Sequence, residues 1–294
     1  MDKLTVVVPV VRVAFDIWEL TLNVGESTRL FPSIFPADAT FTNERFHSSN
    51  DRIVAVSNTG AVRAVSVGTA EITYTVDGIS ATIPVTVEIP VDSFTIGADR
   101  EFYAVGDEGT LTVEFTPEDA TNQSFDVSFS RDAKMLEDGK FRVNAAGDVV
   151  ITVTLPNGMT ESLTITVINL EVLANDVFEL TNVERLNAGL PAFARMRPLT
   201  RAAEERAYEI IESFSHTRPD GRSFVTVFNQ FSVPHTFAGE NLATGQRIAA
   251  DVVAAWMESQ GHRENILNNR FMHIGIGVAL DSEGTIYWVQ LFAD

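Results

Sequence analysis

The chain has 294 residues, too many for one typical core and suited to three units of roughly 100 residues each. Hydrophobic residues make up 45% and charged residues 21%, which excludes extensive disorder, and the net charge of −19 argues against nucleic acid or anionic lipid surfaces as partners. Cysteine is absent, so disulfides and thiolate chemistry are excluded.

The apolar run at residues 4–11 is short, contains Pro9 and is followed by Arg12. It is too short for a membrane span and lacks the pattern of a signal-peptide core, so we expect a first strand there and no transmembrane segment. If the protein is exported, we expect its signal to lie outside this sequence, with Met1 as an internal boundary.

A repeat with an offset of about 80 residues runs through the first 168 residues. The recurring pairs are Val24-Gly25 with Val105-Gly106, PADAT at 36–40 with PEDAT at 117–121, Gly68 with Gly147, and Ile72 with Ile151. In each copy, runs rich in Val, Ile, Thr and Phe alternate with turn residues, which is typical of an antiparallel sandwich. We therefore predict two all-β sandwiches, at residues 1–88 and 89–168.

The first copy carries four motifs in order: VGES at 24–27, PADAT, SSND at 48–51 and GAVRAVSVGTAEIT at 60–73. With these motifs it resembles the bacterial Ig-like domains of group 2. The second copy lacks the SSN turn and has GDVVIT at 147–152, so its resemblance is more distant. The resemblance implies a spacer or adhesion role on a bacterial surface. Since no site is visible in either copy, a stalk without a ligand of its own is the simpler interpretation.

Beyond Val167 the apolar spacing changes from period two to period 3.6, which predicts a third, helix-rich unit at residues 169–294. The first predicted helix is Asp176–Ala188, with its inward face formed by Val177, Leu180, Val183 and Leu186. The second ends near Ser213; its inward residues are Leu199, Ala203, Ala207, Ile210 and Ile211, and its outward residues are Glu204, Glu205, Glu209 and Glu212. The third is predicted at about Arg247–Ser259. A hairpin of strands at 272–280 and 285–292 completes the prediction of helices packed on an antiparallel sheet.

Three polar segments interrupt the apolar patterns of this unit: FSHTRPDG at 214–221, GENLA at 239–243 and WMESQGHRENIL at 256–267. Together with NVERLNAGLP at 182–191 and FMHIGIGVAL at 271–280, their order resembles the compact bacterial branch of the CAP superfamily, the cysteine-rich secretory protein, antigen 5 and pathogenesis-related group. The resemblance covers about residues 174–292. It implies an α+β domain, an α-β-α sandwich with an antiparallel sheet, and hence a multidomain fold of two Ig-like sandwiches and a CAP domain.

The same resemblance implies a cleft lined by two histidines and two acidic residues. The matching positions here are His216 in FSHTRPDG, Glu240 in GENLA and His262 in GHR. The second acidic position holds Ser259, as is usual in the bacterial branch, so the set is incomplete. Glu258 does not replace it.

Helical geometry explains why Glu258 is no substitute. At 100° per residue, Ser259 falls with Val252 and Trp256 on the inward face of the predicted helix, whereas Glu258 points to solvent. His273 alternates with two glycines on one face of its strand and could approach the cleft from the sheet side.

Two neutral imidazoles can hold a divalent metal, and a carboxylate can complete the ligand set or orient a ring. His216 and His262, with Glu240, are therefore candidate ligands for Zn²⁺, Mg²⁺ or Ca²⁺. Simpler roles stay open: His262 as a capping group at a helix start, and Glu240 as an acceptor of backbone N–H groups in a turn. A catalytic set of Ser259, His262 and Glu240 is disfavoured, because no G-x-S-x-G elbow or evident oxyanion hole is present.

Three functions follow from this sequence. We favour a monomeric, secreted or cell-surface binding module whose cleft takes a small molecule, a lipid, a peptide or a cell-surface partner, over an enzyme. The alternative is a metal-assisted, peptidase-like hydrolase with Glu240 as general base and His216 and His262 holding the ion. A purely structural stalk is the third.

Overall fold

The computed structural model describes residues 7–294. It confirms the predicted fold class: a β-rich N-terminal region is followed by an α+β unit with five helices. Each sheet takes its strands from one of three consecutive stretches of chain, 12–88, 93–168 or 194–293. The boundaries proposed at residues 88 and 168 stay predictions. Among the described residues, no helix has the length and apolar character needed to cross a bilayer.

The first sandwich contains a four-stranded sheet in the order β2-β9-β8-β5, a three-stranded sheet β3-β7-β6 and a ribbon β1-β4. Its strands are β1 Arg12–Ala14, β2 Leu20–Asn23, β3 Ser27–Arg29, β4 Ser33–Phe35, β5 Glu44–Ser48, β6 Val54–Val56, β7 Ala61–Ala64, β8 Gly68–Val76 and β9 Ile79–Glu88. The core lies between the two larger sheets and includes Val54, Val62, Ile72 and Val85. The strand predicted at 4–11 is not found: residues 4–6 lie outside the described part, and residues 7–11 form no strand.

The second sandwich has two four-stranded sheets, β10-β12-β15-β14 and β11-β17-β16-β13. Its strands are β10 Ser93–Ala98, β11 Phe102–Ala104, β12 Glu108–Thr116, β13 Asp126–Phe129, β14 Ala133–Met135, β15 Lys140–Val143, β16 Gly147–Thr154 and β17 Thr160–Ile168. The sheet β11-β17-β16-β13 repeats the β2-β9-β8-β5 pattern, with a parallel first pair and antiparallel others. The repeat partners Gly25 and Gly106 share φ values of +86° and +96°, a conformation that favours glycine.

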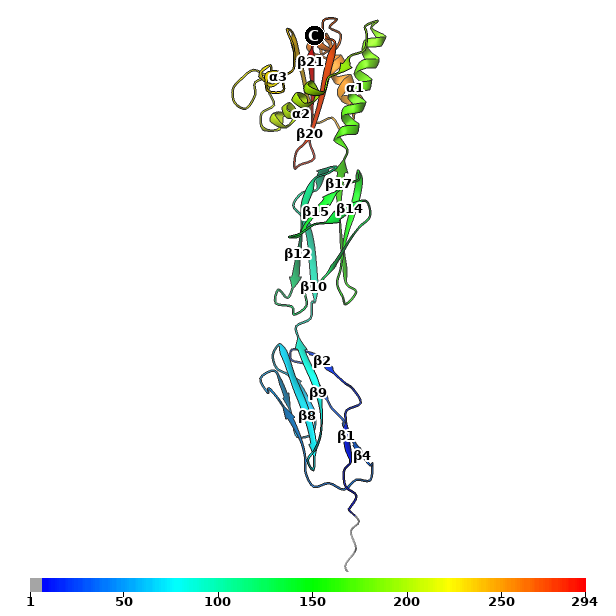
Figure 1. Cartoon of the computed structure of the whole chain (residues 1–294), viewed down its shortest axis with the longest axis vertical. Helices are drawn as coiled ribbons and strands as arrows, with labels where there is room; N and C mark the ends of the chain where they lie inside the picture. The colour runs from blue at the N-terminus through cyan, green and yellow to red at the C-terminus, as the bar shows by residue number, and fades with distance from the viewer. Residues whose placement is uncertain (1–6) are drawn as a thin grey trace, which may run out of the picture. The chain divides into compact units, whose positions relative to one another are not determined.

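The C-terminal domain is a mixed four-stranded sheet, β18-β20-β21-β19, with helices on both faces (Figure 1). Its elements are α1 Leu170–Asn187, β18 Ala194–Arg195, α2 Arg197–Glu212, α3 Thr226–Gln230, β19 Ala238–Thr244, α4 Ala249–Glu258, α5 Gln260–Ile266, β20 His273–Leu280 and β21 Ile286–Ala293. The sheet is antiparallel except that the two-residue edge strand β18 runs parallel to β20. Apolar side chains of α2 and α3 cover one face, and those of α1 and α4 cover the other.

Glycines on β20 let α2 lie directly on the sheet. A Cβ atom at Gly277 would come within 1.9 Å of the Ala203 carbonyl oxygen, and one at Gly275 within 2.3 Å of the Leu199 oxygen. Backbone therefore rests on backbone at this crossing, which only residues without side chains permit. The crossing fixes the position of α2, the helix that supports the candidate site.

Helix α1 differs from its prediction in start and in orientation. It begins at Leu170 rather than Asp176, because the Asn169 side chain accepts a hydrogen bond from the Val172 N–H and caps the first turn. Val183 and Leu186, predicted inward, are exposed. The buried face carries Val177 together with polar groups, Thr181, Asn182 and Arg185, which all find partners inside the domain.

Candidate functional site

Glu240 lies in the middle of a strand, and the turn considered for it is wrong. It belongs to β19 and pairs with Leu291 of β21. Its side chain is fully buried. A Cβ atom at the preceding Gly239 would lie 2.8 Å from the ring of Phe271, so the glycine makes room for the strand to approach that ring.

Both carboxylate oxygens of Glu240 have partners. Arg206 of α2 donates through Nε to Oε1 over 2.8 Å, and His216 Nδ1 lies 2.6 Å from Oε2. Arg206 is itself fully buried. A buried ion pair is tolerated only when its remaining donors are also satisfied, and Arg206 Nη2 donates to the Ser215 carbonyl over 2.7 Å. Glu240 is thus a fixed anion beneath His216.

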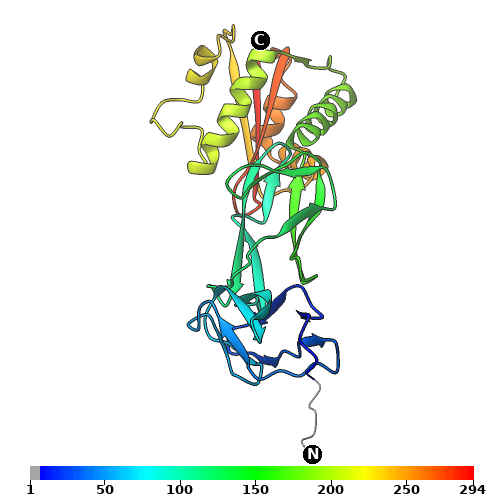
Figure 2. The same cartoon turned by 60° about the horizontal axis from the view of Figure 1, so that its bottom comes forward.

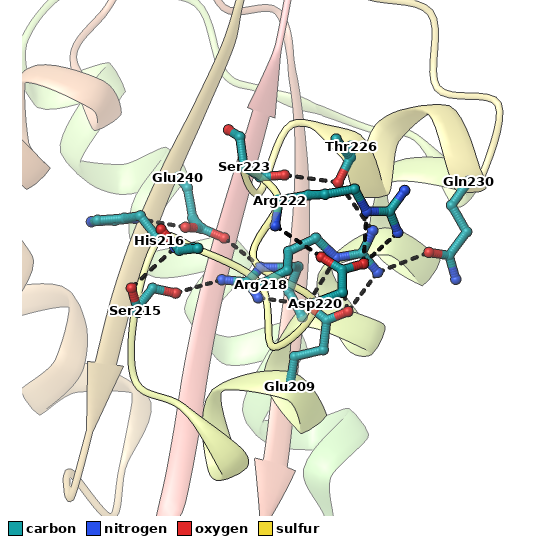
Figure 3. Close-up of polar contacts among 12 residues, drawn as sticks. Glu209, Ser215, His216, Arg218, Asp220, Arg222, Ser223, Thr226, Gln230 and Glu240 are labelled. Carbon is teal, nitrogen blue, oxygen red and sulfur yellow. Dashed lines mark hydrogen bonds and ion pairs between the residues drawn. The ribbon is translucent and has the colours of Figure 1, made fainter.

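A second layer of charge surrounds this pair (Figure 3). Glu209, predicted to point outward, instead accepts hydrogen bonds from Arg206 and from Arg218. Arg218 is buried and also donates to the Gln230 side chain over 2.8 Å. Burial opposes the charge of Glu209, but the two guanidinium groups outweigh it and lower the pKa of that carboxyl. This network ties the segment carrying His216 to α2.

His216 contacts the buried Glu240 on one side and is exposed to solvent on the other. Its side chain is 59% exposed, and the ring of Phe224 lies beside it, with centroids 6.3 Å apart. The hydrogen bond to Glu240 raises the pKa of His216, while burial and the charge of Arg206 act against that rise. With Nδ1 bound to Glu240, the Nε2 atom has no hydrogen-bond partner in residues 7–294 and is free for a ligand.

His262 lies on α5, which polar groups hold against the opposite face of the sheet. Its carbonyl accepts from the Asn241 side chain over 3.1 Å, and Asn265 donates to Asn241 Oδ1 over 2.8 Å. Asn241 also donates to Gln290, and Gln290 donates to Thr181 of α1. Burial and then the nearby charge of His216 lower the pKa of His262. The proximity of the two imidazoles, which the sequence predicts, stays a prediction.

Ser259 takes another position than predicted. It ends α4 in an extended conformation, with φ −85° and ψ 121°, and does not continue the inward stripe of that helix. In the described chain its hydroxyl makes no hydrogen bond to His216, Glu240 or His262. Glu258 is exposed as predicted. His273 begins β20, and in the part of the chain described no hydrogen bond joins it to the other candidates.

The donor set fits a metal only in part. Glu240 is arranged to orient a ring rather than to bind an ion, since Arg206 and His216 occupy its oxygens. Over residues 7–294, no three His, Cys, Asp or Glu side chains are grouped so as to hold a metal ion. Two imidazoles remain, and metal binding by them stays a prediction. Chemically, the oriented His216 ring can accept a proton or a hydrogen bond at Nε2.

Sequence reasoning missed Arg206, Glu209 and Arg218. The available signal was Arg206 itself, an arginine between Ala203 and Ile210 on the inward stripe of α2. A buried arginine requires an acidic partner or several carbonyl groups. Its presence on that stripe therefore indicates an internal anion, which the structure identifies as Glu240.

Comparison with known proteins finds two relatives in Bacillus subtilis (strain 168). The uncharacterized protein YkwD is 39% identical over 118 residues, which are 40% of this chain and 45% of its own length. The uncharacterized membrane protein YlbC is 31% identical over 104 residues, which are 35% of this chain and 30% of its own length. The matches thus span less than half of either relative.

Among solved structures, an outer surface protein from Borrelia burgdorferi aligns with a TM-score of 0.41 at 22% identity, covering 43% of this chain and 96% of its own. The profile of the cysteine-rich secretory protein family, CAP, matches residues 178–292, and that of the group 2 bacterial Ig-like domain matches residues 9–87. The chain therefore carries a CAP domain of the cysteine-rich secretory protein family, C-terminal in sequence to a bacterial Ig-like domain of group 2.

Proposed function

We propose that the CAP domain binds a ligand or partner through the rings of His216 and His262, and that the two β-sandwiches display it outside a bacterial cell. The observation that carries this proposal is the buried Glu240, which Arg206 fixes from α2 and which holds His216 with Nε2 exposed. A domain that only filled space would have no need of a buried carboxylate that orients an exposed imidazole.

The opposite pKa shifts of the two rings define the kind of ligand. His216 takes up a proton more readily than an ordinary histidine, and His262 less readily. As pH falls, His216 is therefore expected to become a cationic donor before His262 does. Such a pair suits an acidic or hydrogen-bond-accepting group on a small molecule, a lipid or a peptide.

The test compares the full chain with the His216→Ala/His262→Ala double variant. Both are screened by surface plasmon resonance against glycans, phospholipid vesicles and peptides, and are titrated calorimetrically with Zn²⁺, Mg²⁺ and Ca²⁺. His47→Ala is the control, because it removes an exposed histidine from the first sandwich. The proposal is supported if the full chain and the control bind a ligand that the double variant does not bind. Equal ligand binding by all three proteins refutes the proposal. Equal ion binding by all three proteins refutes a metal site at the two histidines.

A hydrolase is the second candidate, favoured by the contact of Glu240 with His216. A carboxylate that fixes one nitrogen of an imidazole leaves the other poised as a general base. Because both oxygens of Glu240 are occupied, the base is His216 rather than Glu240 itself. Incubation of the full chain with a peptide pool, followed by mass spectrometry, separates the two functions. Cleavage that His216→Ala abolishes supports hydrolysis, and binding without turnover supports the binding module.

A further inference from the structure

Most of strand β20 has no neighbour on its outer side. In the described chain, β18 pairs with it only at His273 and Ile274. At the far end Asp281 N–H donates to the Thr285 carbonyl, and bonded pairs alternate along an antiparallel ladder. The backbone N–H and C=O groups of Ile276 and Val278 therefore point away from β21. Within residues 7–294 these groups have no hydrogen-bond partner.

A groove runs along this open edge between α1 and α2, helices that Figure 2 shows on either side of the strands. Its volume is about 430 Å³. Ala174 and Phe178 line it from α1, and Thr200, Glu204 and Tyr208 line it from α2. Residues four apart lie on one side of a helix, so each helix forms a continuous wall parallel to the strand. An extended segment that lies between these two walls would continue the sheet as an added strand.

The walls of the groove also carry charge. Glu171 of α1 and Glu204 of α2 line it together with Arg195 of β18, whose guanidinium lies 4.1 Å from the centre of the Phe178 ring. No salt bridge joins either carboxylate to a cation in the described part. Burial, and the negative charge of Glu171, raise the pKa of Glu204, although Arg201 acts in the opposite direction. The two carboxylates therefore repel each other across the groove. A basic side chain between them would relieve that repulsion.

We propose that an extended segment of a partner protein, with basic side chains at alternate positions, adds as a strand to the outer edge of β20. Its backbone pairs with Ile276 and Val278, its apolar side chains pack against Ala174 of α1 and its basic side chains lie between Glu171 and Glu204. Strand addition of this kind draws affinity from main-chain hydrogen bonds and specificity from alternate side chains. The groove shares no residue with His216, Glu240 or His262 and is independent of the function proposed for them.

The probe is a fluorescein-labelled peptide, Val-Lys-Val-Lys-Val-Lys, titrated into the full chain and followed by fluorescence anisotropy. We expect saturable binding that weakens about tenfold when alternate backbone nitrogens of the peptide are methylated, because each lost hydrogen bond has a modest net value. Hydrogen exchange read by NMR is expected to show the Ile276 and Val278 amides protected by the unmodified peptide.

Matched charge variants separate the groove from the acidic surface as a whole. Glu171→Gln/Glu204→Gln removes the two groove carboxylates, and Glu179→Gln/Glu212→Gln removes exposed ones from the same two helices. We expect only the first pair to weaken binding, by about tenfold at low salt. Equal weakening by both pairs overturns the proposal. So does binding that methylation leaves unchanged, protection confined to other amides, or the absence of saturable binding at millimolar peptide.

Discussion

Replacing Gly277 with alanine is expected to destabilise the CAP domain strongly. A Cβ atom there would lie 1.9 Å from the carbonyl oxygen and 2.2 Å from the carbonyl carbon of Ala203, whereas ordinary contacts begin at 3.4 Å. The obstacle is helix backbone, so α2 must withdraw by about 1.5 Å over the sheet. Overpacking of a core costs typically about 1–3 kcal/mol, and because no flexible side chain can yield, we expect about 3 kcal/mol or more.

The assay is denaturant unfolding of the full chain, followed by the fluorescence of Trp256 and Trp288, both buried in the CAP domain. Gly261→Ala is the matched control: a Cβ there meets nothing within 4 Å, and alanine suits the helix α5 better by roughly 0.5–1 kcal/mol. The two substitutions are therefore expected to shift the free energy of unfolding in opposite directions.

The same displacement of α2 reaches the histidine site. Arg206 lies one turn beyond Ala203, so its withdrawal weakens the contact with Glu240. Because the charge of Arg206 lowers the pKa of His216, that pKa is expected to rise further in the variant. If Gly277→Ala unfolds at the same denaturant concentration as Gly261→Ala and leaves the His216 titration unchanged, then α2 does not rest on β20 as described.

Three further predictions concern the site and α1. In NMR titrations, His216 is expected above 6.5 and His262 below it, and Glu240→Gln is expected to lower the pKa of His216. The stabilisation that protonated His216 contributes is then complete below pH 6.5 and lost as pH rises through its folded pKa; a stability that Glu240→Gln leaves equally pH-dependent would contradict this. Arg206→Met leaves Glu240 buried without its cation and is expected to cost about 3–5 kcal/mol in denaturant unfolding, with part recovered by adding Glu240→Gln. Asn169→Ala removes the cap of α1 and is expected to cost about 1 kcal/mol; an unchanged midpoint would show that the cap does not act.

The sequence predicted the sandwiches and the central hairpin because their signal is strictly periodic. The strands predicted at 272–280 and 285–292 become β20 and β21, each within one residue of the prediction, and alternating apolar residues form the β8–β9 hairpin of the first sandwich. Strand β19 escaped prediction because Glu240 and Asn241 are both buried, one on each face. Without alternation between polar and apolar residues, a strand resembles a loop.

The site was predicted only at the residues that motifs carry. His216 and Glu240 are in contact, and the place of His262 beside them stays a prediction. Periodicity cannot reveal that Arg206 is the buried partner of Glu240 or that Ser259 ends α4. The same limit explains the orientation of α1. Its inward face is chosen by Thr181 and Arg185, whose hydrogen bonds inside the domain outweigh the burial of Val183 and Leu186.

Glu240 and Asn241 are adjacent, and the alternation of a strand turns them toward opposite layers. Glu240 rests against α2 and steadies His216, whereas Asn241 connects to α5, the helix of His262. Each imidazole therefore depends on a different half of the interior. A substitution on one side of β19 can therefore alter the support of one histidine while it leaves the direct contacts of the other in place.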